Sequence, residues 1–327
     1  MKQPCRLSLC ALPLLATSLL ATAAPAVAQS YPSSTIRIVV PSAAGTPPDI
    51  VTRVIANELG RSEGWQIVIE NKAGAMQTIG IAEALKQPAD GHTVVVIAQS
   101  ATVAPALLRN INFRLDADLV PVIKVMSANH VLVVHPLVPA NSVSELVDLL
   151  KSQPDKLTFS SGGFGTPAHL AGELFKLQTG VRAAHVPYRA LPQAIGDLIN
   201  GTNHYQFITP LPVLDLIATG KLRAIAATAH ARLPALKDVP TVVEQGFPNL
   251  VIQDWVGWLV KSGTPHEIVA RLNAATNKAL ATASVREAFA KMAAEPAGGP
   301  PAEFGAFVES QIAYWGLMVR ESGIKIP

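Results

Sequence analysis

Two glycine-rich stretches of the sequence have residue types and spacing that could bind an anion. The first, Pro41–Asp49, follows the apolar segment Ile36–Val40, and the second, Ser160–Pro167, follows an apolar segment that begins at Leu157. Each contains a Thr-Pro pair that can start a helix, because threonine caps the first turn and proline occupies a position whose N–H has no helical partner. A helix start offers unpaired N–H donors and the positive end of the helix dipole. The sequence therefore predicts two anion-binding turns with a ligand clamped between them.

The candidate ligand-binding residues come from these turns and from five positions elsewhere. We expect one carboxylate on the backbone of Gly163–Thr166, and a second polar end, if the ligand has one, at the Ser42–Thr46 loop. Ser100 and Ala101 follow a predicted strand end, where ligands collect in α/β sheets, although an ordinary turn is an equal alternative. The predicted ligand-binding residues are Ser42, Ala44, Gly45, Thr46, Asp49, Ser100, Ala101, Ser161, Gly163, Phe164, Gly165, Thr166, His169, Tyr188 and Thr209.

Several of these residues have an alternative structural role. Asp49 lies three residues after Thr46, a spacing typical of a capping box, so it either caps the helix or contacts the ligand. His169 either contacts the ligand or supports the loop, and Tyr188 either faces the cleft or packs as a half-buried ring. Trp255 and Trp258 are interpreted as hinge and core residues, and Asp254 receives no role.

Other chemistries have weaker support. Gly163–Ala168 matches the dinucleotide pattern G-x-G-x-x-A, but no acidic residue follows near His185–Arg189 to bind a ribose. A hydrolase using Ser160, Ser161 and His169 is the alternative function, but the chain has no G-x-S-x-G motif. No two histidines are spaced as H-x-x-x-H, so neither a metal site nor a cofactor is expected.

Residues 1–28 have the pattern of a cleavable signal peptide. Lys2 and Arg6 precede an apolar run from Leu7 to Leu20, and Ala26-Val27-Ala28 resembles a cleavage site. Both cysteines of the chain lie in this leader, so the exported protein would contain no disulfide. Removing Lys2 and Arg6 lowers the formal net charge from +3 to +1, which does not indicate a nucleic-acid partner.

Alternating strand and helix patterns predict an α/β protein with two lobes. The expected strands are Ile36–Val40, Gln66–Glu70, Thr93–Ala98, Val131–Val134, Leu157–Ser160, Ala184–Val186, Tyr205–Ile208, Ala224–Ala227 and Trp255–Val260. The expected helices are Asp49–Leu59, Gln77–Gln87, Val143–Ser152, Ala168–Gln178, Pro192–Asn200, Val213–Ala218, His266–Ala281, Ser284–Met292 and Pro301–Ser322. We expect residues 29–130 and 255–327 to form lobe 1 and residues 131–254 to form lobe 2, joined by a hinge of two crossings.

The sequence resembles the Bug-type periplasmic solute receptors of tripartite tricarboxylate transporters across nearly the whole chain after the leader. The segments that carry the resemblance are Ile36–Asp49, Val68–Ala75, Ile79-Gly80, Asp90–Thr93, Phe159–Phe175, His185–Tyr188, Gly220–Ala224, Asp238–Val242, Gly263–Pro265 and Arg271–Asn273. The resemblance implies a type II periplasmic-binding-protein fold that closes on a small carboxylate through main-chain donors. It also implies a monomeric periplasmic receptor, without catalytic activity, that serves integral-membrane transporter subunits or a sensor ectodomain.

The chain departs from the family pattern at three places. Pro47 and Pro48 stand where the family has glycines, and each proline removes an N–H donor. Thr209 replaces a residue that is often acidic in relatives, which argues against an ammonium group on the ligand. Phe164 places an aromatic ring at the tip of the second loop. We therefore expect a monocarboxylate, or a diacid with one end weakly held, whose apolar body lies between Pro47 and Phe164, and we expect citrate to bind poorly.

Overall fold

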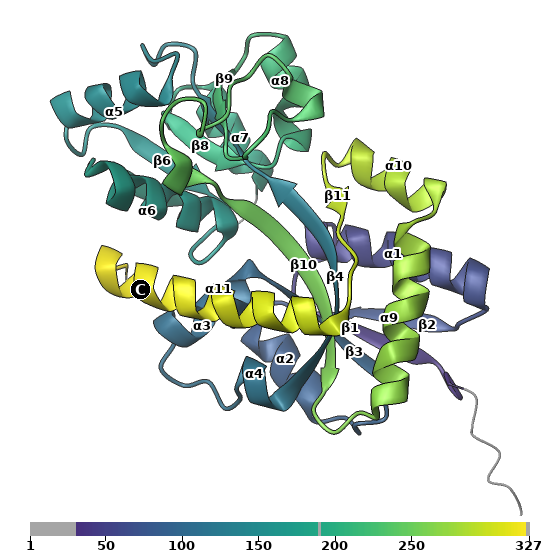
Figure 1. The fold of residues 1–327 in the computed structure, drawn as a ribbon. Helices are drawn as coiled ribbons and strands as arrows, with labels where there is room; N and C mark the ends of the chain where they lie inside the picture. The colour runs from purple at the N-terminus through teal and green to yellow at the C-terminus, as the bar shows by residue number, and fades with distance from the viewer. Residues whose placement is uncertain (1–30, 189–190, 325–327) are drawn as a thin grey trace, which may run out of the picture. The chain divides into compact units, whose positions relative to one another are not determined.

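The eleven described strands form two mixed sheets (Figure 1). The structure is a computed structural model that describes residues 31–188 and 191–324, so the predicted signal peptide lies outside the described residues. The strands of the first sheet, in spatial order, are β11 (Glu295–Pro296), β4 (Leu119–Asn129), β10 (Gln253–Lys261), β3 (Thr93–Ala98), β1 (Ile36–Val40) and β2 (Ile67–Asn71). Those of the second are β7 (Ala184–Pro187), β6 (Thr158–Ser161), β8 (Tyr205–Ile208), β5 (Val131–Val134) and β9 (Arg223–Ala227).

Helices cover both faces of each sheet, which explains why the strands read as nearly continuous apolar runs. In β1, Ile38 and Val40 pack into one hydrophobic cluster while Val39, between them, packs into the cluster on the other face. Leu132 and Val133 of β5 divide in the same way between the two faces of the second sheet. This alternation is the two-residue period of a strand, and it buries every side chain when both faces are covered.

Nine of the eleven described helices agree closely with predicted ones. Those from the first part of the chain are α1 (Pro47–Glu63), α2 (Thr78–Leu85), α3 (Gln99–Leu107), α4 (Leu115–Asp118), α5 (Val143–Ser152) and α6 (Pro167–Thr179). The later ones are α7 (Leu191–Ile199), α8 (Leu214–Ala218), α9 (His266–Leu280), α10 (Ala283–Lys291) and α11 (Pro301–Ser322). Short 3₁₀ turns occur at Ala75–Gln77, Leu211–Val213, Pro234–Leu236 and Pro248–Leu250.

Four elements were not predicted from the sequence: α3, α4, β4 and β11. The strand β4 has eleven residues, but Pro121 and Lys124 interrupt its apolar pattern. Its long antiparallel ladder with β10, from Leu119–Lys261 to Asn129–Gln253, supplies the stabilisation that the local pattern does not indicate. Helix α3 contains Pro105 and has no side-chain cap, so the usual start and stop signals are absent.

The two sheets are connected where β4 continues into β5 and where the chain returns into β10 (Figure 1). Only His130 separates β4 from β5. The buried side chain of Thr228 joins the two connections, because its hydroxyl accepts from His130 N–H at 2.9 Å and lies 2.9 Å from the carbonyl of Ile252. Thr228, which directly follows the edge strand β9, therefore holds both connections together.

Helix α11 packs on both sheets. Phe304 and Val308 in its first half belong to the cluster of β1, β3 and β10, whereas Trp315 and Val319 belong to the cluster of β5, β6 and β8. Figure 1 shows this helix in yellow, running along α3 towards α6. The C-terminal helix therefore contributes to the hydrophobic core of both lobes.

Candidate functional site

The two glycine-rich turns border the same cavity, which has a volume of about 210 Å³. The described residues that line it are Ser42, Thr46, Pro47, Pro48, Gln77, Ala98, Ser100, Met126, Thr166, Pro167, Asp254, Trp255 and Val256. Both helix starts, Thr46–Pro48 of α1 and Thr166–Pro167 of α6, contribute to this lining. Of the predicted ligand-binding residues, the structure brings Ser42, Thr46, Ser100 and Thr166 to the cavity wall.

The first turn, between β1 and α1, is held by the buried carboxylate of Asp49. This group accepts hydrogen bonds from Gly45 N–H at 2.9 Å, from Arg53 Nε at 3.0 Å and from Asn71 Nδ2 at 2.9 Å. Burial acts to raise the pKa of Asp49, but these hydrogen bonds outweigh it and lower the pKa below its ordinary value. Asp49 therefore braces the turn as an ionised group and does not line the cavity.

The predicted capping box does not form at α1. Thr46 has the backbone conformation of an N-cap residue, but its hydroxyl donates to the carbonyl of Ala43 at 2.7 Å and accepts nothing from the helix. Gly45, with a φ of +79°, turns its N–H towards Asp49, so the carboxylate bonds one residue before the N-cap. The hydroxyl of Thr46 and the carboxylate of Asp49, which a capping box would use, are therefore both hydrogen-bonded within the turn instead.

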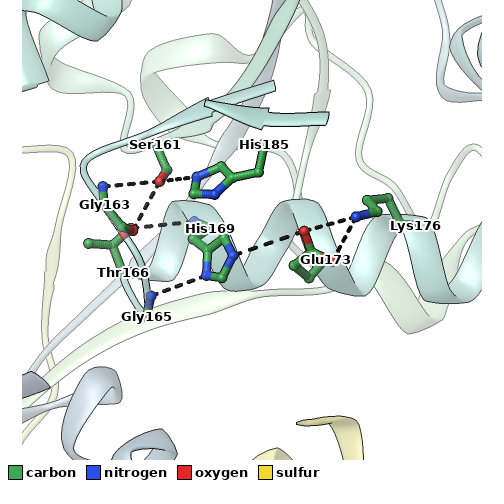
Figure 2. Close-up of polar contacts among 8 residues, drawn as sticks. All are labelled: Ser161, Gly163, Gly165, Thr166, His169, Glu173, Lys176 and His185. Carbon is green, nitrogen blue, oxygen red and sulfur yellow. Dashed lines mark hydrogen bonds and ion pairs between the residues drawn. The ribbon is translucent and has the colours of Figure 1, made fainter. Parts of the chain in front are cut away.

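The second turn, between β6 and α6, is stabilised by hydrogen bonds among its own groups (Figure 2). Gly163 N–H donates to Ser161 Oγ at 3.1 Å, and Gly165 N–H donates to His169 Nδ1 at 3.1 Å. The hydroxyl of Thr166 accepts from His169 N–H at 3.4 Å, which confirms the predicted N-cap with Pro167 in the first turn. His169 therefore supports the loop, one of the two roles that the sequence allows.

Two neutral imidazoles lie behind this turn. The rings of His169 and His185 have centroids 4.2 Å apart, and burial lowers the pKa of His169 to about 4 and that of His185 to about 3. The ring of Phe164 packs edge-on against both, at 5.5 and 5.2 Å. Phe164 is 37% exposed and is not among the residues that line the cavity, so it covers the imidazoles rather than facing Pro47.

These internal bonds limit the main-chain donors that remain for a ligand. In the second turn, the N–H groups of Gly163, Gly165 and Thr166 are already bonded within the loop. The N–H groups of Gly162, Phe164 and Ala168 are left without a partner among the described residues. An anion at the start of α6 would therefore meet these three N–H groups first.

Ser100 lies in the first turn of α3, not in an ordinary turn. Its hydroxyl donates to the carbonyl of Gly165 at 2.9 Å and thereby links the end of β3 to the second glycine turn, 65 residues along the chain. Ala101, the next residue, is 2% exposed and packs against the first sheet. Ser100 is thus the residue of this pair that reaches the cavity.

A strained segment between β2 and α2 was missed by the sequence analysis. Ala75, Met76 and Gln77 have φ values of 42°, 52° and 76°, in the left-handed region that residues with a side chain rarely adopt. The buried amide of Gln77 donates to Ser42 Oγ at 3.3 Å and accepts from Ala98 N–H at 2.9 Å. The strained backbone therefore places one side chain between the first turn and the end of β3, both of which line the cavity.

Tyr188 and Thr209 are not among the described residues that line the cavity. The hydroxyl of Tyr188 donates to Asp197 Oδ2 at 2.6 Å and accepts from Asn203 Nδ2 at 2.6 Å. Its hydrogen-bonding capacity is therefore used within the second lobe. Thr209 lies directly after β8 and away from the cavity lining, so its side chain does not indicate which polar group the ligand carries.

The pair formed by Ser161 and His185 has the distance of a nucleophile and its base. Ser161 Oγ lies 2.7 Å from His185 Nε2 (Figure 2). A working triad also needs an acid at the second ring nitrogen, but His185 Nδ1 is buried without a partner in the described part of the chain. With its pKa lowered to about 3, this imidazole is a weak base, and Ser161 is itself fully buried. The pair supports the glycine turn.

The cavity-wall residues that were not predicted include Asp254 and Trp255 at the start of β10. Trp255 is 1% exposed, and its Nε1 has no hydrogen-bond partner among the described residues. Asp254 is the one charged side chain in the lining, and burial raises its pKa to about 7. The sequence signal that could have identified Asp254 is an acidic residue directly before an apolar strand.

No described helix combines the length and the hydropathy that a membrane crossing needs. Within residues 31–188 and 191–324, no group of three or more His, Cys, Asp or Glu side chains is arranged to hold a metal ion.

Residues 51–324 match the family model described as "Tripartite tricarboxylate transporter family receptor". Protein BugT of Bordetella pertussis is 35% identical over 306 residues, which cover 93% of this chain and 94% of that protein. A solved structure described as a periplasmic transporter is 34% identical, with a TM-score of 0.81, and the match covers 90% of this chain and 99% of that one. The R. palustris protein Rpa4515, solved with adipate, is 30% identical, with a TM-score of 0.80 and coverage of 90% and 99%.

The two solved structures share this chain's two-lobed α/β fold over 90% of its length. Their sequence identity and coverage are high enough to carry the family as well as the fold. This chain belongs to the tripartite tricarboxylate transporter receptor family and is an extracytoplasmic solute receptor of the Bug type with a type II periplasmic-binding-protein fold.

Proposed function

We propose that this receptor binds a small carboxylate in the cavity bordered by the two glycine-rich turns. The observation that carries the proposal is that the starts of two helices, α1 and α6, line one cavity in which none of the described lining residues is Lys, Arg or His. Helix N-termini attract anions through unpaired N–H groups and the helix dipole. The adipate bound to the R. palustris relative is a ligand of this chemical class.

The cavity favours a ligand with an apolar body. Pro47 and Pro48 add rigid apolar surface and no N–H donors, and Met126 and Trp255 supply further apolar wall. Phe164, which the sequence analysis placed opposite Pro47, packs on the imidazoles, so we propose Trp255 and Met126 in its place. With a volume of about 210 Å³ and so few donors, the site suits a monocarboxylate or a diacid with one end weakly held, and citrate should bind poorly.

We propose that residues 29–130 and 255–327 form lobe 1 and residues 131–254 form lobe 2. The sheet membership of the strands supports this division, because β5 to β9 belong to one sheet and β10 to the other. The two connections, tied by Thr228, would act as the hinge about which the lobes close on the ligand.

The proposal extends to export and to partners. Residues 1–28 would direct the chain to the periplasm and be removed there, which fits the periplasmic location of the solved relatives. The closed receptor, as a monomer, would deliver its ligand to integral-membrane transporter subunits or to a sensor ectodomain. No bond is made or broken in this role, since Ser161 and His185 serve to hold the second turn.

A thermal-shift screen of small carboxylates, each paired with its uncharged amide, tests the proposed function. A carboxylate present at 100 times its dissociation constant adds about 2.7 kcal/mol to the unfolding free energy, and the matching amide should add far less. Equal stabilisation by acid and amide would refute an anion site at the helix starts. Release of p-nitrophenol from p-nitrophenyl acetate that disappears in Ser161→Ala would support a hydrolase instead.

A further inference from the structure

Asp254 introduces a negative group into a cavity that otherwise suits an anion. It is the one charged side chain among the described residues that line the cavity, and it lies beside Trp255 at the start of β10. The two helix starts that we propose as the carboxylate site line the same cavity. A ligand that fills it therefore meets the starts of two helices and an acidic side chain.

The carboxyl group of Asp254 has no hydrogen-bond donor in the described part of the chain. Its Oδ1 is buried without a partner, and its Oδ2 lies 3.6 Å from His130 Nε2, which is longer than a hydrogen bond. Burial lowers the pKa of His130 to about 4, so the imidazole carries no charge that could compensate the acid at neutral pH. Buried polar groups are nearly always satisfied, and an unsatisfied one costs a substantial part of its solvation free energy.

The ligand is the component that can supply the missing donor. An ammonium group has three N–H bonds and a positive charge, and it would both satisfy Asp254 and favour its ionised form. A second carboxylate at this place would add a like charge next to a half-buried acid, with no basic side chain in the lining to offset it. Thr209, whose lack of a charge disfavours an ammonium group, does not line the cavity, whereas the acidic Asp254 does.

We propose that Asp254 binds a hydrogen-bond-donating group, in the first place an ammonium, at the end of the ligand opposite its carboxylate. The receptor then prefers amino-carboxylates to dicarboxylates of the same length. This inference rests on the proposed function, because it assumes that the other end of the ligand is a carboxylate held at the helix starts.

The test compares ligands that differ only in the terminal group. Isothermal titration calorimetry at about pH 8.5, where the ammonium is still protonated, would use γ-aminobutyrate against succinate and butyrate. The longer series would be δ-aminovalerate against glutarate and valerate, and ε-aminocaproate against adipate and caproate. In the length that fits, we expect the amino-carboxylate to bind about 10- to 100-fold more tightly than its dicarboxylate partner, as for a hydrogen bond to a charged group.

The variant Asp254→Asn should remove this preference. The matched control is Asp148→Asn, which neutralises an exposed acid on α5 and should leave the preference unchanged. A preference that survives in Asp254→Asn would overturn the proposal. If Asp254→Asn does not fold, the wild-type comparison still decides, because a panel in which no amino-carboxylate binds more tightly than its dicarboxylate also overturns it. If dicarboxylates or plain monocarboxylates bind best, the inference about Asp254 fails but the proposed function stands. The proposed function itself fails if no carboxylate stabilises the protein in the thermal-shift screen.

Discussion

Replacing Gly165 by alanine should weaken ligand binding as well as destabilise the fold. Gly165 has a φ of +72°, and a Cβ atom at this position would overlap the terminal methyl of Met76 and lie 3.0 Å from its sulfur. Met76 belongs to the strained segment before α2, and the carbonyl of Gly165 accepts the hydroxyl of Ser100. The added methyl group therefore acts where the second turn meets the elements that line the other side of the cavity.

The magnitude follows from two local costs. Moving the flexible Met76 side chain off its preferred rotamer costs about 0.5–1.5 kcal/mol. Shifting the loop enough to lose the hydrogen bond from Ser100 costs a further ~0.5–1.5 kcal/mol. Both costs destabilise the conformation in which the two turns face the same ligand. Together they predict that the ligand binds about 5- to 150-fold more weakly. The left-handed backbone adds about 1–2 kcal/mol to the destabilisation of the fold itself.

The control is Gly180→Ala, because Gly180 at the end of α6 has a φ of +68° and no atom within 4 Å of an added Cβ. Calorimetry with the tightest-binding acid of the carboxylate panel should show reduced affinity for Gly165→Ala and wild-type affinity for Gly180→Ala. Adding Met76→Ala to Gly165→Ala should restore part of the binding, as a double-mutant cycle would measure. Wild-type affinity in Gly165→Ala would refute the close contact between the second turn and Met76.

Three further predictions concern acid stability, ligand charge and the apolar wall. His130, His169 and His185 have folded pKa values lowered from about 6.5 to about 4, 4 and 3, so the unfolded chain binds more protons below pH 6.5 and the unfolding free energy should fall as pH decreases towards 4. Asp254, with its pKa raised to about 7, opposes this trend, so urea denaturation of Asp254→Asn should show a steeper loss over the same range. Affinity for a carboxylate should fall as pH drops below the ligand's own pKa and depend only moderately on salt; binding that persists in the neutral form would contradict an anion site. Calorimetry should show that an aromatic monoacid binds more tightly than citrate. Replacing Pro47 and Pro48 by two glycines should reduce this difference in affinity. If citrate is the tightest ligand of the wild-type protein, the apolar wall is disproved.

The sequence alone determined the features that depend on local chemistry. The bounds of α5 and α11 agree with the structure because apolar spacing and the residues at the ends fix a helix without distant contacts. The Thr166 cap of α6 and the two glycine-rich turns are likewise local, and their residues identify the family as well. The strand-and-helix alternation was sufficient to predict an α/β fold with two lobes.

Only the tertiary structure decided which groups surround the cavity and which are already bonded. Ser100 reaches Gly165 across 65 residues, and the β4–β10 ladder overrides a strand pattern broken by Pro121. The same folding places Asp254 in the cavity wall without a donor. The physical reason is that burial and hydrogen-bond satisfaction depend on neighbours far apart in the chain, so the types of residue in the two turns could be read from the sequence but their remaining free donors, and the acid that faces them, could not.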